Sequence, residues 1–99
     1  MTATKFSFHP AAIDEAEASA RWYRERSPLS AARFVDELNE VIDRILEAPE
    51  RWPQGARGTR KVKLPCFPFL VIYRVSKGAV LVMAVAHGRR RPGYWKNRL

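Results

Sequence analysis

A broad apolar stripe between Ser27 and Pro49 sets the strongest limit on the fold of this chain. Ser27 is a suitable N-cap and Pro28 a suitable first helical residue, while Ala48-Pro49 ends the run. The stripe follows helical spacing and consists of Phe34, Val35, Leu38, Val41, Ile42, Ile45 and Leu46. A helix with one apolar face has to bury that face, so the rest of the chain must supply an apolar surface to receive it.

The segment before this helix predicts a short strand and another helix. Residues 5–8 alternate between polar and apolar, and Pro10 fits the first turn of a helix. Residues 11–26 contain no Gly or Pro, and their apolar positions recur at helical spacing at Ile13, Ala16, Ala20 and Tyr23. The short connection at Ser27 makes the two helices an antiparallel hairpin.

After residue 50 the pattern changes from helical to extended. Residues 50–59 form a loop, residues 60–64 alternate, residues 69–75 are apolar on both faces, and residues 79–87 follow a hairpin turn. The expected order is strand, helix, helix and three strands, which is a two-layer α+β domain with the hairpin on a mainly antiparallel sheet. We expect one domain over residues 1–99, with a basic and aromatic tail at 89–99.

Charge divides the chain at Glu50. Residues 1–50 hold ten Asp and Glu against six Lys and Arg, a formal charge of −4, whereas residues 51–99 hold twelve Lys and Arg and no acid. A region that cannot neutralise its own positive charge attracts polyanions and accelerates association with them. This division predicts a negatively charged partner.

Arg60, Lys61 and Lys63 are the first candidates to contact that partner. Cations on the solvent face of a strand form a rigid row that could meet successive phosphates. A solvent-facing strand position also favours Lys and Arg with no partner at all. Because no acid is near them in sequence, contact with phosphate or carboxylate is at least as well supported for the set.

His87 and Arg74 are candidates for chemistry. His87 closes the last strand, on a face shared with Leu81, Met83 and Val85, and could act as a general acid or base. It could equally hydrogen-bond the following loop. Arg74 shares a face with Leu70 and Ile72, and because burying an unpaired guanidinium is costly, it either reaches solvent or meets an acid on the helices. A structural ion pair is the first interpretation, and a catalytic or phosphate-holding role is the second.

The tail combines Arg89, Arg90 and Arg91 with Tyr94 and Trp95. Cations beside aromatic rings suit single-stranded RNA, whose bases stack on the rings. The same residues suit an acidic protein partner, or they pin the tail to the core. Composition leaves these three interpretations open.

Several classes of site have no signature in the sequence. There is no Gly-rich phosphate loop, carboxylate pair or metal-ligand cluster, so we expect no metal and no cofactor. A nuclease of this composition would have to be metal-independent and cleave RNA through the 2′-hydroxyl. The lone Cys66 allows no internal disulfide and the apolar runs are too short for a bilayer, which predicts a cytoplasmic protein with no membrane partner.

Six segments form a pattern in order and spacing. They are Phe8-His9-Pro10, Trp22-Tyr23, Arg33-Phe34, residues 48–53, residues 67–74 and residues 84–95. Together they resemble the RelE/ParE superfamily of type II toxin–antitoxin toxins, also called plasmid stabilisation proteins, over nearly the whole chain. The resemblance implies two helices against a mainly antiparallel sheet. It also implies a cognate antitoxin whose acidic or amphipathic C-terminal segment wraps the toxin, and operator DNA bound only through that antitoxin.

The superfamily divides by target. RelE-like members cleave mRNA on the ribosome, and Lys61, Lys63, His87 and Tyr94 lie approximately where such toxins carry functional residues, with Arg74 as the nearest arginine in the central strand. Leu70 stands where RelE-like toxins tend to carry that arginine. ParE-like members poison DNA gyrase and need no catalytic residues, and the resemblance leans slightly to them. A remnant that only binds antitoxin is the third possibility.

Overall fold

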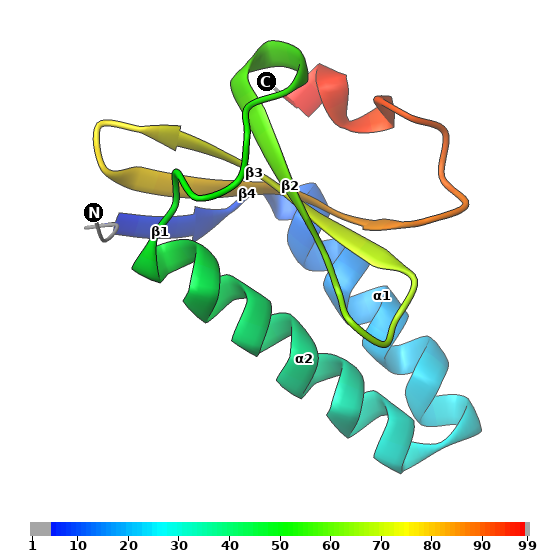
Figure 1. Cartoon of the computed structure of the whole chain (residues 1–99). Coiled ribbons are helices and arrows are strands. Elements are labelled where there is room, and N and C mark those ends of the chain that lie inside the picture. Colours follow the sequence, from blue (N-terminus) through cyan, green and yellow to red (C-terminus); the bar gives the residue numbers. More distant parts are fainter. Residues whose placement is uncertain (1–4, 99) are drawn as a thin grey trace.

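The order of elements is the one expected from the sequence. The computed structural model describes residues 5–98, and its elements follow each other with short connections (Figure 1). They are β1 (Lys5–Phe8), α1 (Pro10–Arg26), α2 (Pro28–Glu47), the 3₁₀ helix η1 (Ala56–Gly58), β2 (Thr59–Lys63), β3 (Phe69–Ser76), β4 (Ala79–His87) and the 3₁₀ helix η2 (Tyr94–Arg98). The two 3₁₀ helices were not predicted, and η2 gives the tail a defined structure.

The helical hairpin is closed by a single residue. Ser27 ends α1, where its amide donates to the carbonyl of Tyr23 (2.7 Å), and begins α2, where its hydroxyl accepts from the amide of Ser30 (3.2 Å). Pro28 then occupies the first position of α2, where a missing N–H costs nothing. The predicted antiparallel hairpin is confirmed.

The sheet has four strands in the order β1-β4-β3-β2. β1 runs parallel to β4, while β3 is antiparallel to both of its neighbours, β4 and β2. The β3–β4 hairpin turns at Lys77 and Gly78, both with positive φ (51° and 77°), as two-residue hairpin turns of this hand require. The predicted mainly antiparallel sheet is therefore confirmed.

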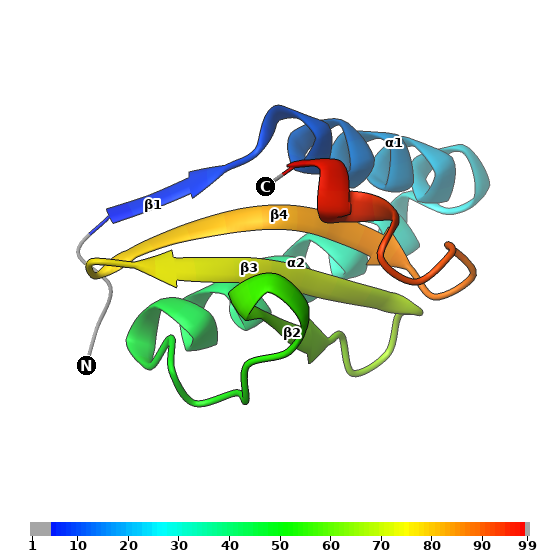
Figure 2. The ribbon, with the colours of Figure 1, turned by 90° about the horizontal axis from the view of Figure 1, so that it is seen from above.

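The two faces of the sheet are covered differently. In Figure 1 both helices lie below the strands and η2 lies above them, and Figure 2 shows η2 across β4 with α2 behind the strands. The helix-covered face holds most of the core, including Phe34, Leu38, Ile45, Val62, Phe69, Tyr73 and Val82. A second cluster on the opposite face consists of Ile72, Met83, Ala84, Ala86 and Trp95.

A β-bulge changes the face to which the second half of β4 was assigned. Ile72 pairs with Ala84 and Tyr73 pairs with Val82, so Met83 is an extra residue in β4. One extra residue reverses the alternation beyond it. The prediction that His87 shares a face with Leu81 and Met83 is therefore wrong.

Neither helix within residues 5–98 combines the length and apolar character needed to cross a bilayer.

Candidate functional site

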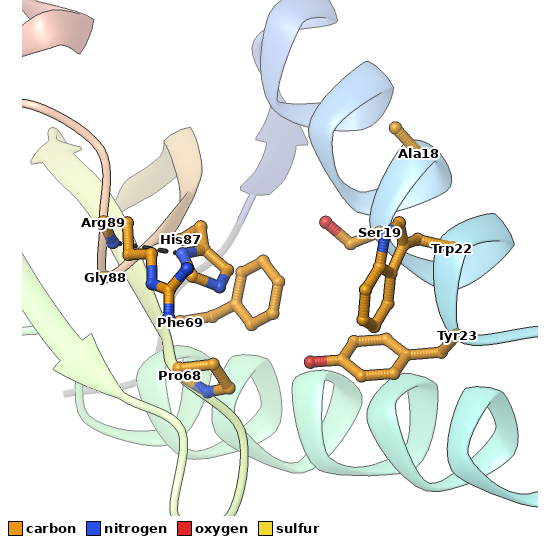
Figure 3. Close-up of a pocket in the computed structure, with 9 residues that line it drawn as sticks. All are labelled: Ala18, Ser19, Trp22, Tyr23, Pro68, Phe69, His87, Gly88 and Arg89. Atoms are coloured by element: carbon orange, nitrogen blue, oxygen red, sulfur yellow. Dashed lines mark hydrogen bonds between the residues drawn. The ribbon is translucent and has the colours of Figure 1, made fainter. Parts of the chain in front are cut away.

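A groove lies where α1 passes the ends of β3 and β4 (Figure 3). Its volume is about 690 Å³. The lining residues are Ala18, Ser19, Trp22 and Tyr23 from α1, Pro68 and Phe69 at the start of β3, and His87, Gly88 and Arg89 at the end of β4. Because the lining is mainly apolar and aromatic, the groove is suited to receive side chains of another molecule.

Trp22 is the most exposed aromatic side chain of the groove. It is 52% exposed, its ring lies edge-on to Tyr23, and the guanidinium of Arg26 stands 3.6 Å from its ring centroid. Burial raises the pKa of the neighbouring Tyr23 hydroxyl. An exposed tryptophan beside a cation is a typical anchor of a protein interface.

His87 forms the opposite wall of the groove. Its ring packs edge-on against Phe69, with centroids 5.1 Å apart, and its Nδ1 accepts a hydrogen bond from the amide of Arg89 (3.0 Å). The imidazole therefore orders the loop that begins the basic tail. This is the structural alternative that the sequence left open for His87.

Glu15 of α1 holds the tail in place. Its Oε2 accepts from the hydroxyl of Tyr94 (2.6 Å), and both of its oxygens accept from the guanidinium of Arg98 (2.9 Å each). Oε1 also accepts from the amide of Val85 (3.0 Å), and Arg98 donates to the carbonyl of Met83 (2.9 Å). We call Glu15, Tyr94 and Arg98 the tail clasp, which caps the part of the β4 edge that β1 does not reach.

The clasp shifts the pKa values of its members. Burial would raise the pKa of Glu15, but hydrogen bonds from Arg98, Tyr94 and the Val85 amide outweigh it and lower that pKa. Burial, followed by the hydrogen bond to the Glu15 carboxylate, raises the pKa of Tyr94 far above its ordinary value. Tyr94 is therefore a neutral structural donor and a poor proton-transfer group near neutral pH.

The predicted row of three strand cations is reduced to two. Lys61 and Lys63 are exposed, whereas Val62 lies between them in the helix-side core. Arg60 has the same parity as Val62 and turns to that side, where its guanidinium donates to the carbonyls of Glu50 and Trp52. The prediction that Arg60 presents its charge on the same face as the lysines is wrong, because strand alternation sends it the other way.

Arg74 does not reach the helices. It lies on the face of β3 that carries Leu70 and Ile72, opposite to the helix-covered face, and pairs in register with Thr59 and Leu81. Within residues 5–98 the single ion pair joins Arg98 to Glu15. The predicted ion pair between Arg74 and a helix acid is therefore not formed.

The tail residues divide between core and surface. Trp95 is only 2% exposed and packs on the sheet, so its predicted use as a stacking surface does not fit its position. Arg89, Arg90 and Arg91 are exposed, and Arg90 covers the ring of Tyr94 at 3.9 Å. Of the three interpretations of the tail, pinning to the core describes its aromatic residues.

The conditional catalytic residues are not brought together. His87 faces the groove beside α1, Arg74 lies on the opposite face of the sheet, and Tyr94 is held by Glu15. Among residues 5–98, no three His, Cys, Asp or Glu side chains group as ligands of a metal ion would.

The sequence pattern does not single out Glu15 or Trp22. Glu15 looked like one more surface acid of a helix, although it lies 79 and 83 residues from its clasp partners. In the sequence, Trp22 belongs to the Trp22-Tyr23 segment, with no pattern that assigns it a role of its own. Its position among polar residues of α1, away from Ala20 on the buried side, was the available signal of an exposed aromatic residue.

Known proteins resemble this chain in family and fold. The family described as "ParE toxin of type II toxin-antitoxin system, parDE" matches residues 6–92. A search of curated proteins finds no match. Seven solved chains match, among them one from the "Chromosomal ParDE TA system from P. aeruginosa", with a TM-score of 0.73 and 17% identity, covering 84% of this chain and 94% of that one. At that identity the likeness shows the fold, and the family match over residues 6–92 leads to the assignment: the chain belongs to the ParE family and is the toxin component of a type II toxin–antitoxin system.

Proposed function

We propose that this toxin inhibits growth by binding DNA gyrase and holding its cleaved DNA complex, with no chemistry of its own. The observation that carries the proposal is that His87 faces the groove beside α1, whereas Arg74 lies on the other face of the sheet and the hydroxyl of Tyr94 is held by Glu15. A nuclease of this composition would need such groups within hydrogen-bond reach of one phosphate. Their separation supports a toxin that works by binding.

We also propose that the groove is where the cognate antitoxin neutralises the toxin. Its apolar walls favour an amphipathic segment, and the cations of Arg89 and Arg26 at its margins favour carboxylates on that segment. An acidic amphipathic segment meets both requirements.

The gyrase proposal is tested with purified toxin, supercoiled plasmid and gyrase. We expect linear DNA to accumulate when the reaction is stopped with denaturant, and we expect His87→Ala and Tyr94→Phe to retain this activity. In parallel, 5′-end mapping of mRNA in a purified translation system should show no new ends. Ribosome-dependent cuts that disappear in those two variants would replace the proposal with the endoribonuclease alternative.

The antitoxin proposal is tested by measuring affinity with two matched variants. Trp22→Ala removes an exposed ring of the groove, and we expect a loss of roughly 30-fold, as for an interface anchor. Leu29→Ala removes an even more exposed side chain of α2 outside the groove and should change the affinity less than threefold. Equal effects of the two variants would exclude the groove as the docking site.

A further inference from the structure

None of the four strands carries an Asp or Glu, while three of them carry Lys or Arg on the face away from the helices. We propose that this face, formed by Lys5, Lys61, Lys63 and Arg74 and called here the open sheet face, binds the phosphate backbone of duplex DNA. The inference deepens the proposed function, on which its biological meaning rests: the toxin would contact the DNA that gyrase holds as well as the enzyme.

Strand alternation places all four cations on one side. Phe8 packs in the helix-side core, and Phe6 contacts it with ring centroids 5.2 Å apart, so Lys5 lies on the other side of β1. Lys61 and Lys63 alternate with the buried Val62, and the Nζ of Lys61 lies 5.9 Å from the ring of Trp95 in the second cluster. These positions belong to both edge strands of the sheet.

Arg74 connects the two edges. It follows Leu70 and Ile72 on the same face of β3, and its register neighbours are Thr59 of β2 and Leu81 of β4. Thr59 is two residues from Lys61 along β2, and Leu81 pairs with Ser7 of β1, so Arg74 is placed on the sheet between the cations of β2 and that of β1. The four charges therefore cross the sheet as one band.

None of these four charges has a carboxylate partner among residues 5–98. The single ion pair within residues 5–98 uses Arg98 and Glu15, and the remaining acids lie on the helices or at Glu50. Cations that no carboxylate neutralises can displace the counterions that surround DNA, which is the main source of sequence-independent affinity.

The aromatic residues argue for a duplex over a single strand. Single-stranded nucleic acid is held largely by bases stacked on exposed rings. On this side of the sheet Trp95 is buried, and the ring of Tyr94 is covered by Arg90 at 3.9 Å while its hydroxyl is bound to Glu15. The exposed large apolar residues within 5–98 are Phe6, Ile13, Trp22, Leu29 and Val35, which lie on the helix side of β1 or on the helices. Because this face has no exposed large aromatic ring among residues 5–98, it can contact the phosphates of a nucleic acid but cannot stack on its bases.

The test is the salt dependence of binding to a fluorescent 20-base-pair duplex of mixed sequence, followed by anisotropy. Removing two phosphate contacts with Lys61→Ala/Lys63→Ala should reduce the slope of log K against log salt by roughly 1.8. The control Arg21→Ala/Arg24→Ala removes the same charge from exposed positions of α1 and should leave the slope nearly unchanged. Lys61→Arg/Lys63→Arg should restore the wild-type slope, which separates loss of charge from loss of folding.

Three results would overturn the inference. They are equal slopes for the lysine variant and its α1 control, equal affinity for a single-stranded RNA of the same length, and equal competition by polyglutamate of the same total charge. The gyrase assay distinguishes the two proposals. If the toxin causes gyrase-dependent DNA cleavage but the lysine variant leaves the DNA-binding slope unchanged, only the DNA-binding role of the open sheet face is refuted. If the slopes change as expected but the toxin has no effect on gyrase, only gyrase as the target is refuted.

Discussion

The two faces of the sheet are buried by very different means. One face lies under α1 and α2, 17 and 20 residues long, and packs the ring of Phe34 against those of Tyr23, Phe67 and Phe69. The other is covered in part by the five-residue η2, held by the tail clasp. Apolar area therefore holds the first layer together, whereas the second combines the buried ring of Trp95 with the hydrogen bonds of one carboxylate.

This difference separates two kinds of stability. Loss of packing on the helix side should unfold the domain as a whole, because the hairpin and three strands share that core. Loss of the clasp should free the tail while the helices and strands remain folded. The following changes probe the difference in order of decreasing effect.

Phe34→Ala should cause the largest loss. The side chain is fully buried among three aromatic rings, so its removal should lower the free energy of unfolding by about 3–5 kcal/mol. Urea denaturation followed by circular dichroism measures this. Val35→Ala, at a site 40% exposed, is the matched control and should lose less than about 1 kcal/mol. Similar losses for the two would mean that the helix face is not the main core.

Glu15→Gln should act locally and less strongly, by about 2–3 kcal/mol, because it removes the charge that satisfies Arg98 at a half-buried site. The expected signature is faster hydrogen exchange of the Val85 amide, with the amides between β2 and β3 unchanged. The exposed Glu17→Gln on the same helix is the control. Uniformly faster exchange across the sheet would show that the clasp supports the whole fold.

The stabilisation that the tail clasp contributes should also depend on pH. Hydrogen bonding lowers the pKa of Glu15 in the folded protein below its ordinary value of 4.5, so the unfolded chain takes up the proton first as pH falls. The stabilisation is therefore complete above about pH 4.5 and is lost as pH falls through the folded value. The stability difference between wild type and Glu15→Gln should shrink over this range, and a constant difference down to pH 2 would contradict the assignment.

Tyr94→Phe should have the smallest effect. It removes one hydrogen bond to Glu15 and keeps the ring, which should cost about 0.5–1.5 kcal/mol and leave toxicity intact. Tyr23→Phe, whose hydroxyl has no hydrogen-bond partner within residues 5–98, should be nearly neutral. Growth after induced expression gives the second measurement, and full loss of toxicity with normal stability would assign Tyr94 a role in the target site.

Local pattern predicted the secondary structure but not the long-range contacts. The stripe of α2 and the alternation of β2 are set by neighbouring residues, and Ser27-Pro28 marks a helix start on its own. The bulge at Met83 depends on how β4 pairs with β3, and the tail clasp depends on a turn of the chain back to α1. Neither leaves a local signal.

The site was harder to predict than the fold for the same reason. Charge composition correctly separated an acidic hairpin from a basic sheet, but it could not show which cations share a face. Arg60 is the instructive case, because the alternation that placed Lys61 and Lys63 outward already placed Arg60 inward. At position 60 the alternation of the strand, and not the charge of the side chain, decides which face the residue occupies.

The Ser27 junction has a consequence for how the protein is degraded. Proteases cut extended, locally unfolded segments, and a link of one residue that caps both helices provides none between Pro10 and Glu47. The first clip by a trypsin-like enzyme should fall instead at Arg51 or Arg57 in the loop before β2, or at Arg89 or Arg90 before the clasp. The lifetime of the toxin would then be set by these two connections, even though Arg21, Arg24 and Arg33 are just as exposed to solvent.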